Sequence, residues 1–273
     1  MDANSTEPRN GVKPLRVIQI SDTHLFEDET ARLAGVATDA SARDVFEAAL
    51  AQACGVDLVV VTGDLVHDGS VTAYRRLRDR LRAAGAPVLV VPGNHDGPDV
   101  MRRVFDDGPV RWCESCRVGA WQVESLNSHR GDDPGGSLGE AQLEAFTRRL
   151  AAGSGPVLTL VHHPPVALGA PWLDRIGLAD GPELVDRLAA SGRPAVVVWG
   201  HAHQAWAGGD ERLRLLGAPS TCVQFAPGCA DFTLDTRPPG WRWLSLYRDG
   251  AVETGVERLP AGMHAAAMDC GGY

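Results

Sequence analysis

Long hydrophobic runs are missing from this chain of 273 residues. No apolar segment approaches the roughly 20 residues that a helix needs to cross a bilayer. Residues 1–14 are polar and lack the apolar core of a secretory signal. We therefore expect a cytoplasmic protein that does not associate with membranes.

A basic excess is also missing. The chain has 26 Lys and Arg residues against 35 Asp and Glu residues, which gives a net charge of −9. A negative protein repels polyanions, so nucleic acid is excluded as the main partner. An anionic small molecule would have to be attracted by a local positive feature. No motif identifies a protein partner.

A second cysteine pair, which a structural zinc site would need, is absent as well. Cys113 and Cys116 form the single C-x-x-C motif, and the other four cysteines are scattered. We expect reduced thiols with no special role. Without linkers or repeats, the chain is predicted to have a flexible N-terminus over 1–14, one domain over 15–259 and a weakly ordered tail over 260–273.

What the sequence does contain is an alternation of two kinds of segment. Short runs rich in β-branched residues predict buried strands, and amphipathic stretches between them predict helices. This order is typical of an α/β protein with partly parallel strands. In the last third, strands without helices predict a second, antiparallel sheet packed on the first, with a tight turn at residues 248–250. The predicted strands are 16–21, 57–62, 87–91, 156–162, 195–199, 213–216, 232–234, 241–247 and 251–258, and the helices are 38–54, 70–84, 139–152 and 181–190.

Carboxylates, a carboxamide and imidazoles follow five of the predicted strands. In α/β sheets the carboxyl ends of strands line the ligand crevice, so these side chains are expected to converge. The set holds oxygen and nitrogen donors and no thiolate, which suits Mn²⁺, Fe²⁺ or Zn²⁺. Seven donors are too many for one catalytic ion, whereas two ions about 3.5–4 Å apart form a clamp for displacement at phosphorus. The candidate ligands are Asp22, His24, Asp64, Asn94, His162, His201 and His203.

The spacing within these motifs adds detail. In an extended segment residues i and i+2 point the same way, so D-x-H and H-x-H are each expected to face the metals. Glycines at 63, 93 and 200 allow the backbone to approach the ions. His95 would point toward the substrate and either stabilise charge on phosphoryl oxygens or donate a proton to a leaving group. Asp96 would cap the next helix.

The remaining histidines are assigned more simply. His67, His129 and His264 are expected at the surface, with a place for His67 at the border of the pocket kept as an alternative. His162 is preferred over its neighbour His163, because only one of two adjacent side chains normally faces a site.

The motifs D-x-H, G-D, G-N-H-D, H and G-H-x-H, in this order, resemble those of the calcineurin-like metallophosphoesterase superfamily. Residues 19–26, 92–96 and above all 218–241 are similar to the bacterial class III cyclic nucleotide phosphodiesterases. The resemblance implies a sandwich of two mixed sheets flanked by helices. It also implies one ion held by Asp22, His24, Asp64 and His203, and another held by Asp64, Asn94, His162 and His201.

The same resemblance implies hydrolysis of 3′,5′-cyclic AMP to 5′-AMP by attack of a metal-bound hydroxide. Asp64 and His95 would be catalytic. Substrate contacts are expected from His24, Asp64, Asn94, His95 and His203, and at the nucleoside from Thr221 and Gln224. One alternative is a broader phosphodiesterase acting on 2′,3′-cyclic nucleotides, glycerophosphodiesters or lipid-linked diphosphates. Another is a non-catalytic scaffold, which would be expected to have lost ligands.

Overall fold

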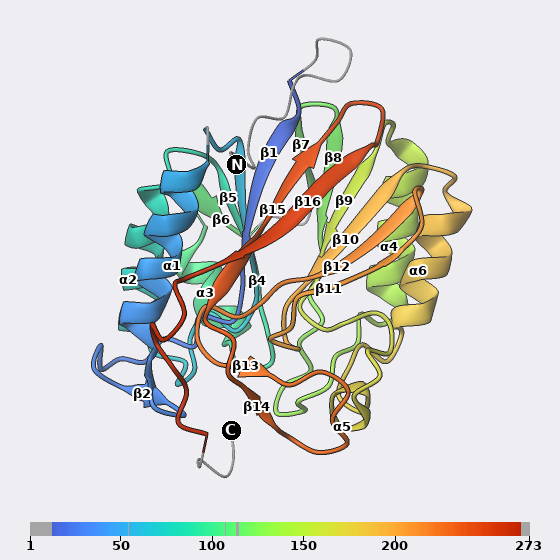
Figure 1. Ribbon diagram of the computed structural model, residues 1–273. Coiled ribbons are helices and arrows are strands. Elements are labelled where there is room, and N and C mark those ends of the chain that lie inside the picture. Colours follow the sequence, from blue (N-terminus) through green and yellow to red (C-terminus); the bar gives the residue numbers. More distant parts are fainter. Residues whose placement is uncertain (1–12, 54, 107, 113–114, 269–273) are drawn as a thin grey trace.

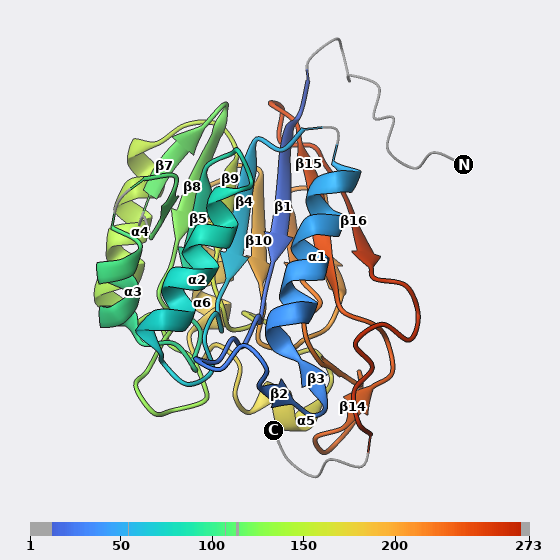
Figure 2. The same cartoon turned by 90° about the vertical axis from the view of Figure 1, so that its left-hand side faces the viewer.

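Two six-stranded mixed sheets face each other, and helices cover their outer faces (Figures 1 and 2). This computed structural model describes residues 13–53, 55–106, 108–112 and 115–268. Helices α1 to α3 lie on one outer face, and α4 and α6 on the other. The predicted fold, a mixed β-sandwich flanked by helices, is confirmed.

The first sheet has the order β16-β15-β1-β4-β5-β6. Four of its six strands, β1, β4, β5 and β6, are parallel, and the β15–β16 hairpin pairs with β1 in antiparallel orientation. Its strands are β1 (Leu15–Ile20), β4 (Leu58–Thr62), β5 (Val88–Val91), β6 (Val110–Arg111), β15 (Gly240–Leu246) and β16 (Val252–Arg258), with the helices α1 (Thr38–Gln52), α2 (Val71–Arg82) and α3 (Pro98–Val104).

The second sheet has the order β11-β12-β10-β9-β8-β7. Strands β8, β9, β10 and β12 run parallel, and each edge carries one antiparallel strand. Its strands are β7 (Ser115–Val118), β8 (Trp121–Ser125), β9 (Val157–Leu160), β10 (Ala195–Trp199), β11 (Trp206–Gly209) and β12 (Leu213–Gly217), with the helices α4 (Glu140–Ala152) and α6 (Gly181–Ala190).

The C-terminal strands correct one prediction. They do not form a separate antiparallel sheet, because β12 pairs in parallel with β10 in the second sheet while β15 and β16 extend the first. The tight turn at 248–250 is confirmed: the Gly250 N–H donates to the Tyr247 carbonyl at 3.0 Å, and Gly250 has φ 92°. Every second residue of the central strands points into the space between the sheets, so both sheets contribute side chains to the same core.

The interior between the sheets is apolar, with Val60, Leu158 and Val198 among its fully buried side chains. Near the carboxyl ends of the strands, buried Gln19 links the two sheets. Its amide donates to Thr62 Oγ1 at 3.0 Å and to the Trp199 carbonyl at 2.9 Å. This polar connection fixes the strand ends of one sheet against those of the other, where the predicted ligands begin.

Short elements gather at this end of the sandwich, in the lower part of Figure 1. They are β2 (Arg32–Leu33), β3 (Val36–Ala37), α5 (Pro171–Asp174), β13 (Gln224–Phe225) and β14 (Leu234–Asp235). In the described part of the chain, no helix combines the length and apolar character needed to span a membrane. The predicted domain limits stay predictions, and residues 1–12, 269–273 and Cys113 lie outside the described ranges.

Candidate metal centre and adjoining cavity

The loops after β1, β4, β5, β9 and β10 meet at one end of the sandwich, as their position at strand ends predicts. The Asp22 N–H donates to the Gly63 carbonyl at 3.0 Å, and the Gly200 N–H donates to the His162 carbonyl at 3.1 Å. Asp64 lies at the centre. Its Oδ2 is 3.6 Å from His24 Nε2 and 3.3 Å from His162 Nε2.

The other donors fall into two groups on either side of Asp64. In the first group, His203 Nε2 lies 3.2 Å from His24 Nε2 and 3.5 Å from Asp22 Oδ1. In the second, Asn94 Oδ1 lies 3.1 Å from His162 Nε2 and 3.0 Å from His201 Nδ1. The structure thus brings all seven candidate ligands together. It separates His201 from His203, in the division that the resemblance implies.

The backbone of this cluster corrects the reasoning from extended segments. Five candidate ligands have left-handed backbone angles: Asp22 at φ 54°, His24 at 43°, Asp64 at 51°, His201 at 61° and His203 at 49°. The motif residues therefore lie in irregular loops after the strands and not in extended segments, although the side chains of Asp22 and His24 still converge on the cluster. Gly93 and Gly200 leave no room for a side chain, because a Cβ would overlap Asp64 and Ser21 respectively, whereas the approach of the backbone to the ions stays a prediction.

Outer hydrogen bonds orient several imidazoles. His162 Nδ1 lies 2.7 Å from the Thr62 carbonyl, and His203 Nδ1 lies 2.8 Å from the Val223 carbonyl. When Nδ1–H donates to these carbonyls, Nε2 of each ring is left as a neutral acceptor that faces the cluster. A carbonyl behind the ring is the usual way in which proteins fix the tautomer of a ligating histidine.

Burial makes this cluster costly without a compensating cation. Burial, together with the charge of Asp64, raises the pKa of Asp22 to about 7. Burial acts the same way on Asp64, but the charges of His162 and His24 outweigh it and hold the pKa of Asp64 well below its usual range. Burial lowers the pKa of His24 and His201 strongly, and that of His203 to about 3. His162 is the exception: burial would lower its pKa, but the charge of Asp64 outweighs burial and raises the pKa of His162 to about 9. The group therefore combines two carboxylates with the neutral imidazoles of His24, His201 and His203 and a basic His162.

Of the eight buried side-chain polar atoms without a hydrogen-bond partner among the described residues, two belong to candidate metal ligands, namely Asp22 Oδ2 and His201 Nε2. Unpaired buried polar atoms are rare in proteins and call for an explanation such as a bound ion. Oxygen and neutral nitrogen donors suit divalent metal ions of the first transition row. The residues present therefore fit a divalent-metal centre.

Two further histidines, His163 and His67, lie beside the cluster. His163 turns away from Asp64, with Nδ1 2.8 Å from Ser128 Oγ and Nε2 3.1 Å from the Pro134 carbonyl. The expectation of a surface position for His67 is wrong. Its ring is half-buried, and its Nδ1 lies 3.1 Å from His24 Nδ1. Only the short distance from Asp64 in the sequence pointed to this place.

Asp96 does not cap the following helix. The N-cap residue of α3 is Gly97, and no side chain caps this helix. The buried carboxylate of Asp96 instead accepts hydrogen bonds from the backbone of Leu65, Val66 and Gly93, at 2.8 to 3.1 Å, and from the Tyr74 hydroxyl at 2.8 Å. It thereby joins the loop that carries Asp64 to the loop that carries Asn94.

A cavity of about 640 Å³ opens beside the cluster. One wall is polar, with Asp64, Asn94, His95 and His201. Another part of the lining is aromatic: Trp172, Phe225 and Phe232 pack edge to face with ring centroids 5.3 to 5.4 Å apart. The remaining lining residues are Asp132, Asp133, Pro134, Leu173 and Ile176.

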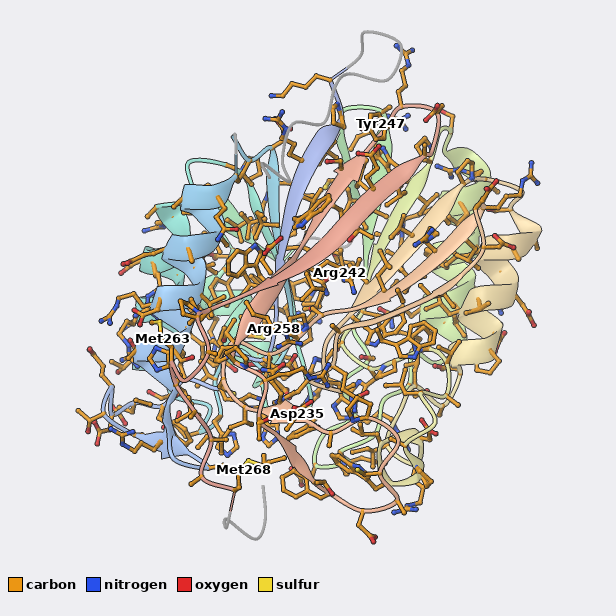
Figure 3. The ribbon with its side chains drawn as sticks, in the orientation of Figure 1. Asp235, Arg242, Tyr247, Arg258, Met263 and Met268 are labelled. Carbon is orange, nitrogen blue, oxygen red and sulfur yellow. The ribbon has the colours of Figure 1, made fainter. Side chains whose placement is uncertain are left out.

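The predicted nucleoside contacts are corrected within the same segment. Thr221 and Gln224 are buried and are not among the residues that line the cavity. The Gln224 amide donates to the Ser220 carbonyl at 2.8 Å, and its Oε1 accepts from Arg258 at 3.1 Å (Arg258 is labelled in Figure 3). Phe225 and Phe232, which the sequence reasoning missed, face the cavity instead, although both lie in the stretch 218–241.

The fold, the loops and the donor set are those of a metal-dependent phosphoesterase. The family model described as calcineurin-like phosphoesterase matches residues 15–205, and this chain belongs to that family. The expected enzyme class is thereby confirmed. Family membership and the donor cluster together indicate divalent metal ions as cofactors.

Curated relatives match nearly the whole chain. The chain is 38% identical over 274 residues to the 3′,5′-cyclic adenosine monophosphate phosphodiesterase CpdA of Pseudomonas aeruginosa, covering 100% of both. It is 40% identical over 265 residues to CpdA of Escherichia coli K12, covering 95% of each. Among solved structures, purple acid phosphatase PPD1 from yellow lupin matches with a TM-score of 0.63 and 12% identity. This match covers 89% of this chain and 51% of that one, and it supports the fold alone.

Proposed function

We propose that this protein hydrolyses 3′,5′-cyclic AMP to 5′-AMP in the cytoplasm, using two divalent ions (Fe²⁺, Mn²⁺ or Zn²⁺). The observation that carries the proposal is the identity of 38% to 40%, over 95% to 100% of the chain, to curated 3′,5′-cyclic AMP phosphodiesterases. The cavity supports it, because its lining combines polar residues of the donor cluster with aromatic residues around a space large enough for a nucleotide.

The ligand assignment follows the two groups of donors. Asp22, His24 and His203 would hold one ion, and Asn94, His162 and His201 the other, with Asp64 shared between them. Such ions supply Lewis acidity that activates water and neutralises charge on the phosphate. The His95 backbone N–H donates to Asp64 Oδ1 at 2.9 Å, which fixes that carboxylate with Oδ2 toward His24 and His162.

The chain's own polar groups would complete the reaction. Asn94 Oδ1 faces His162 and His201, which leaves the amide NH₂ of Asn94 to donate to a phosphoryl oxygen. His95 lines the cavity and would donate a proton to the departing 3′ oxygen. Trp172 and Phe232 would stack against adenine, a contact that is worth about 1–3 kcal/mol per base in other proteins.

Steady-state kinetics on a substrate panel test this function. The panel holds cyclic AMP, cyclic GMP, 2′,3′-cyclic AMP, a glycerophosphodiester and a phosphomonoester. Cyclic AMP should give the highest kcat/KM. Equal rates on all the diesters would support the broader phosphodiesterase instead, and no hydrolysis after loading with Mn²⁺, Fe²⁺ or Zn²⁺ would refute the proposal.

Two substitutions separate metal binding from acid catalysis. Asp64→Ala should abolish activity on every substrate and lower the metal content, because this residue serves both ions. His95→Ala should lower kcat by about 10²- to 10⁴-fold, as expected for loss of a general acid, with metal content unchanged by elemental analysis. Equal loss of metal in both variants would contradict these separate roles. His264→Ala, which changes a histidine bonded to Asp44 on α1, is the control.

A further inference from the structure

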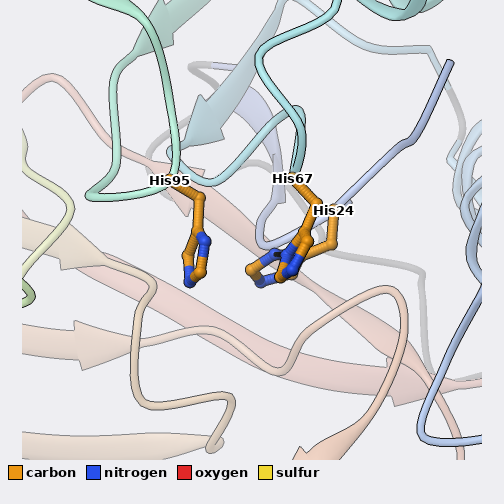
Figure 4. A group of neighbouring side chains, drawn as sticks. All are labelled: His24, His67 and His95. Carbon is orange, nitrogen blue, oxygen red and sulfur yellow. Dashed lines mark hydrogen bonds between the residues drawn. The ribbon is translucent and has the colours of Figure 1, made fainter.

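His67 contacts two residues of the proposed active site without lining the cavity. Figure 4 shows the imidazoles of His24, His67 and His95 grouped together, each from a different loop. The His67 ring stacks on the His95 ring with centroids 4.5 Å apart and planes 20° apart. On another side it contacts Phe26, with ring centroids 4.8 Å apart.

The contact between His67 and His24 fixes the direction of a hydrogen bond. His24 directs Nε2 toward Asp64 and His203, so Nε2 is the atom that would bind an ion. A neutral His24 that ligates through Nε2 carries its proton on Nδ1. That Nδ1–H then donates to His67 Nδ1, 3.1 Å away, and His67 must carry its own proton on Nε2.

Backbone hydrogen bonds fix the position of His67 relative to His24. The His67 N–H donates to the Leu25 carbonyl at 2.8 Å, and the His24 N–H donates to the Asp64 carbonyl at 2.9 Å. The two loops therefore run side by side with a fixed offset, and His67 cannot shift along His24. A partner held in this way restricts both the tautomer and the rotation of the ligating ring.

We propose that His67 is a positioning residue with two separable effects. Its Nδ1 accepts the outer N–H of His24 and so orients a metal ligand, and its ring face holds His95 against the cavity. The proposal rests on the proposed role of this cluster as a metal centre. It requires a phosphodiester substrate of any kind, and it does not depend on cyclic AMP being that substrate.

Three variants separate the two effects. His67→Phe keeps a ring against His95 but removes the acceptor for His24. His67→Gln keeps an acceptor oxygen but removes the ring, and His67→Ala removes both. The Kd of Mn²⁺ is measured without substrate, from the electron paramagnetic resonance signal of the free ion. Turnover is then measured at saturating Mn²⁺ with the best diester of the panel and with bis(p-nitrophenyl) phosphate.

His67→Phe should weaken Mn²⁺ binding by about 10- to 100-fold, the usual effect of losing an outer partner of a ligand, and should lower kcat less than it lowers affinity. His67→Gln should lower kcat more than it lowers Mn²⁺ affinity. Its loss of kcat should be larger for the natural-type diester than for bis(p-nitrophenyl) phosphate, whose leaving group needs no proton. His264→Gln, a change in a half-buried histidine bonded to Asp44, should match the wild type in both measurements.

Three results would overturn the proposal. Wild-type Mn²⁺ affinity in both His67→Phe and His67→Ala would show that His67 does not orient His24. Equal losses of kcat on both substrates in His67→Gln would show that the ring does not act through His95. Three ions per wild-type chain and two per variant would make His67 a ligand, because His24, His67 and His95 lie close enough to share a metal. Circular dichroism melting of each variant verifies the fold.

Discussion

Individual residues of the proposed centre are held in backbone conformations that residues other than glycine rarely adopt. Asp22, His24, Asp64, His201 and His203 all have positive φ. Such strain is of order 1–3 kcal/mol per residue, and it persists only where the surroundings determine the conformation. Here the His201 N–H donates to Asp22 Oδ1 at 2.9 Å, across the two sheets. This hydrogen bond ties the loop that bears His201 to the loop that bears Asp22 and so fixes the positions of the two donors.

Phe232 tests the aromatic wall at the level of one side chain. It is half-buried, whereas Phe225 is only 2% exposed and stacks on His203, so Phe232 can be changed with less damage to the core. Phe232→Ala should weaken binding of 5′-AMP by about 5- to 150-fold, the equivalent of about 1–3 kcal/mol of stacking. Binding of ribose 5-phosphate, which lacks the base, should stay unchanged.

Competitive inhibition by 5′-AMP and by ribose 5-phosphate measures this difference directly. Trp112→Leu is the control, because this half-buried ring packs against the core beneath α3 and outside the cavity. If Phe232→Ala weakened binding of both inhibitors equally, Phe232 would maintain the shape of the pocket and would not contact the base.

At the scale of elements, the helices that flank the first sheet are tied to the loop that bears His24. Asp39 in the first turn of α1 accepts from Arg76 Nε at 2.7 Å and from Arg80 Nη2 at 2.6 Å, both on α2. Arg76 also donates to the Phe26 carbonyl at 2.6 Å. One carboxylate thus links α1, α2 and the segment that follows the D-x-H motif.

Asp39→Asn should weaken this link. Burial raises the pKa of Asp39, but the hydrogen bonds and charges of Arg80 and Arg76 outweigh it, so the pKa lies below its ordinary value. A depressed pKa adds stability above the unfolded value of about 3.9, and this stability is lost as the pH falls through the folded value. We expect a loss of about 1–2 kcal/mol at pH 7, after allowing for solvent screening.

Urea unfolding at pH 7 and at acidic pH measures the effect. The difference in free energy of unfolding between wild type and Asp39→Asn should narrow as the pH falls below about 4. Asp79→Asn, at an exposed position of α2, should stay within about 0.5 kcal/mol of the wild type. A constant difference in the free energy of unfolding across this pH range would mean that ionised Asp39 is not the source of the stability.

The elements and the donors were predictable from the sequence for a physical reason. Buried parallel strands need continuous apolar runs, so the strands ending before Asp22, Asp64 and His201 stand out. The cavity wall was not predictable in the same way, because its aromatic residues come from α5 and from the segment around β13. Only the folded chain brings these segments together. His67 shows the same limit, since ring stacking leaves no periodic pattern.

At the scale of the whole molecule, the local charge at the site matters more for substrate binding than the net charge of the chain. The chain carries a net charge of −9, and its proposed centre adds two buried carboxylates. Both facts disfavour an anionic substrate until divalent cations are bound. Local positive charge at the strand ends would reverse the field at this one site. The folded protein and its ions are therefore expected to stabilise each other.

Removal of metal tests this coupling. Asp22 and Asp64 are 0% and 2% exposed, so an empty centre leaves their carboxylates buried without cations. An ion present at 100 times its Kd stabilises the native state by about 2.7 kcal/mol, which is equivalent to a shift in Tm of about 5–10 °C for a domain of this size. Protein treated with EDTA should therefore melt at a lower temperature, and Mn²⁺ should restore the Tm.

Calorimetry with and without Mn²⁺ gives the shift, and Asp64→Ala gives its origin. This variant lacks the shared carboxylate, so its Tm should respond little to either EDTA or Mn²⁺. His264→Ala should respond as the wild type does, because His264 lies on Asp44 of α1 and outside the donor cluster. An equal response in Asp64→Ala would place the stabilising ions elsewhere on the protein. An absent response in the wild type would mean that the strained loops hold their form without metal.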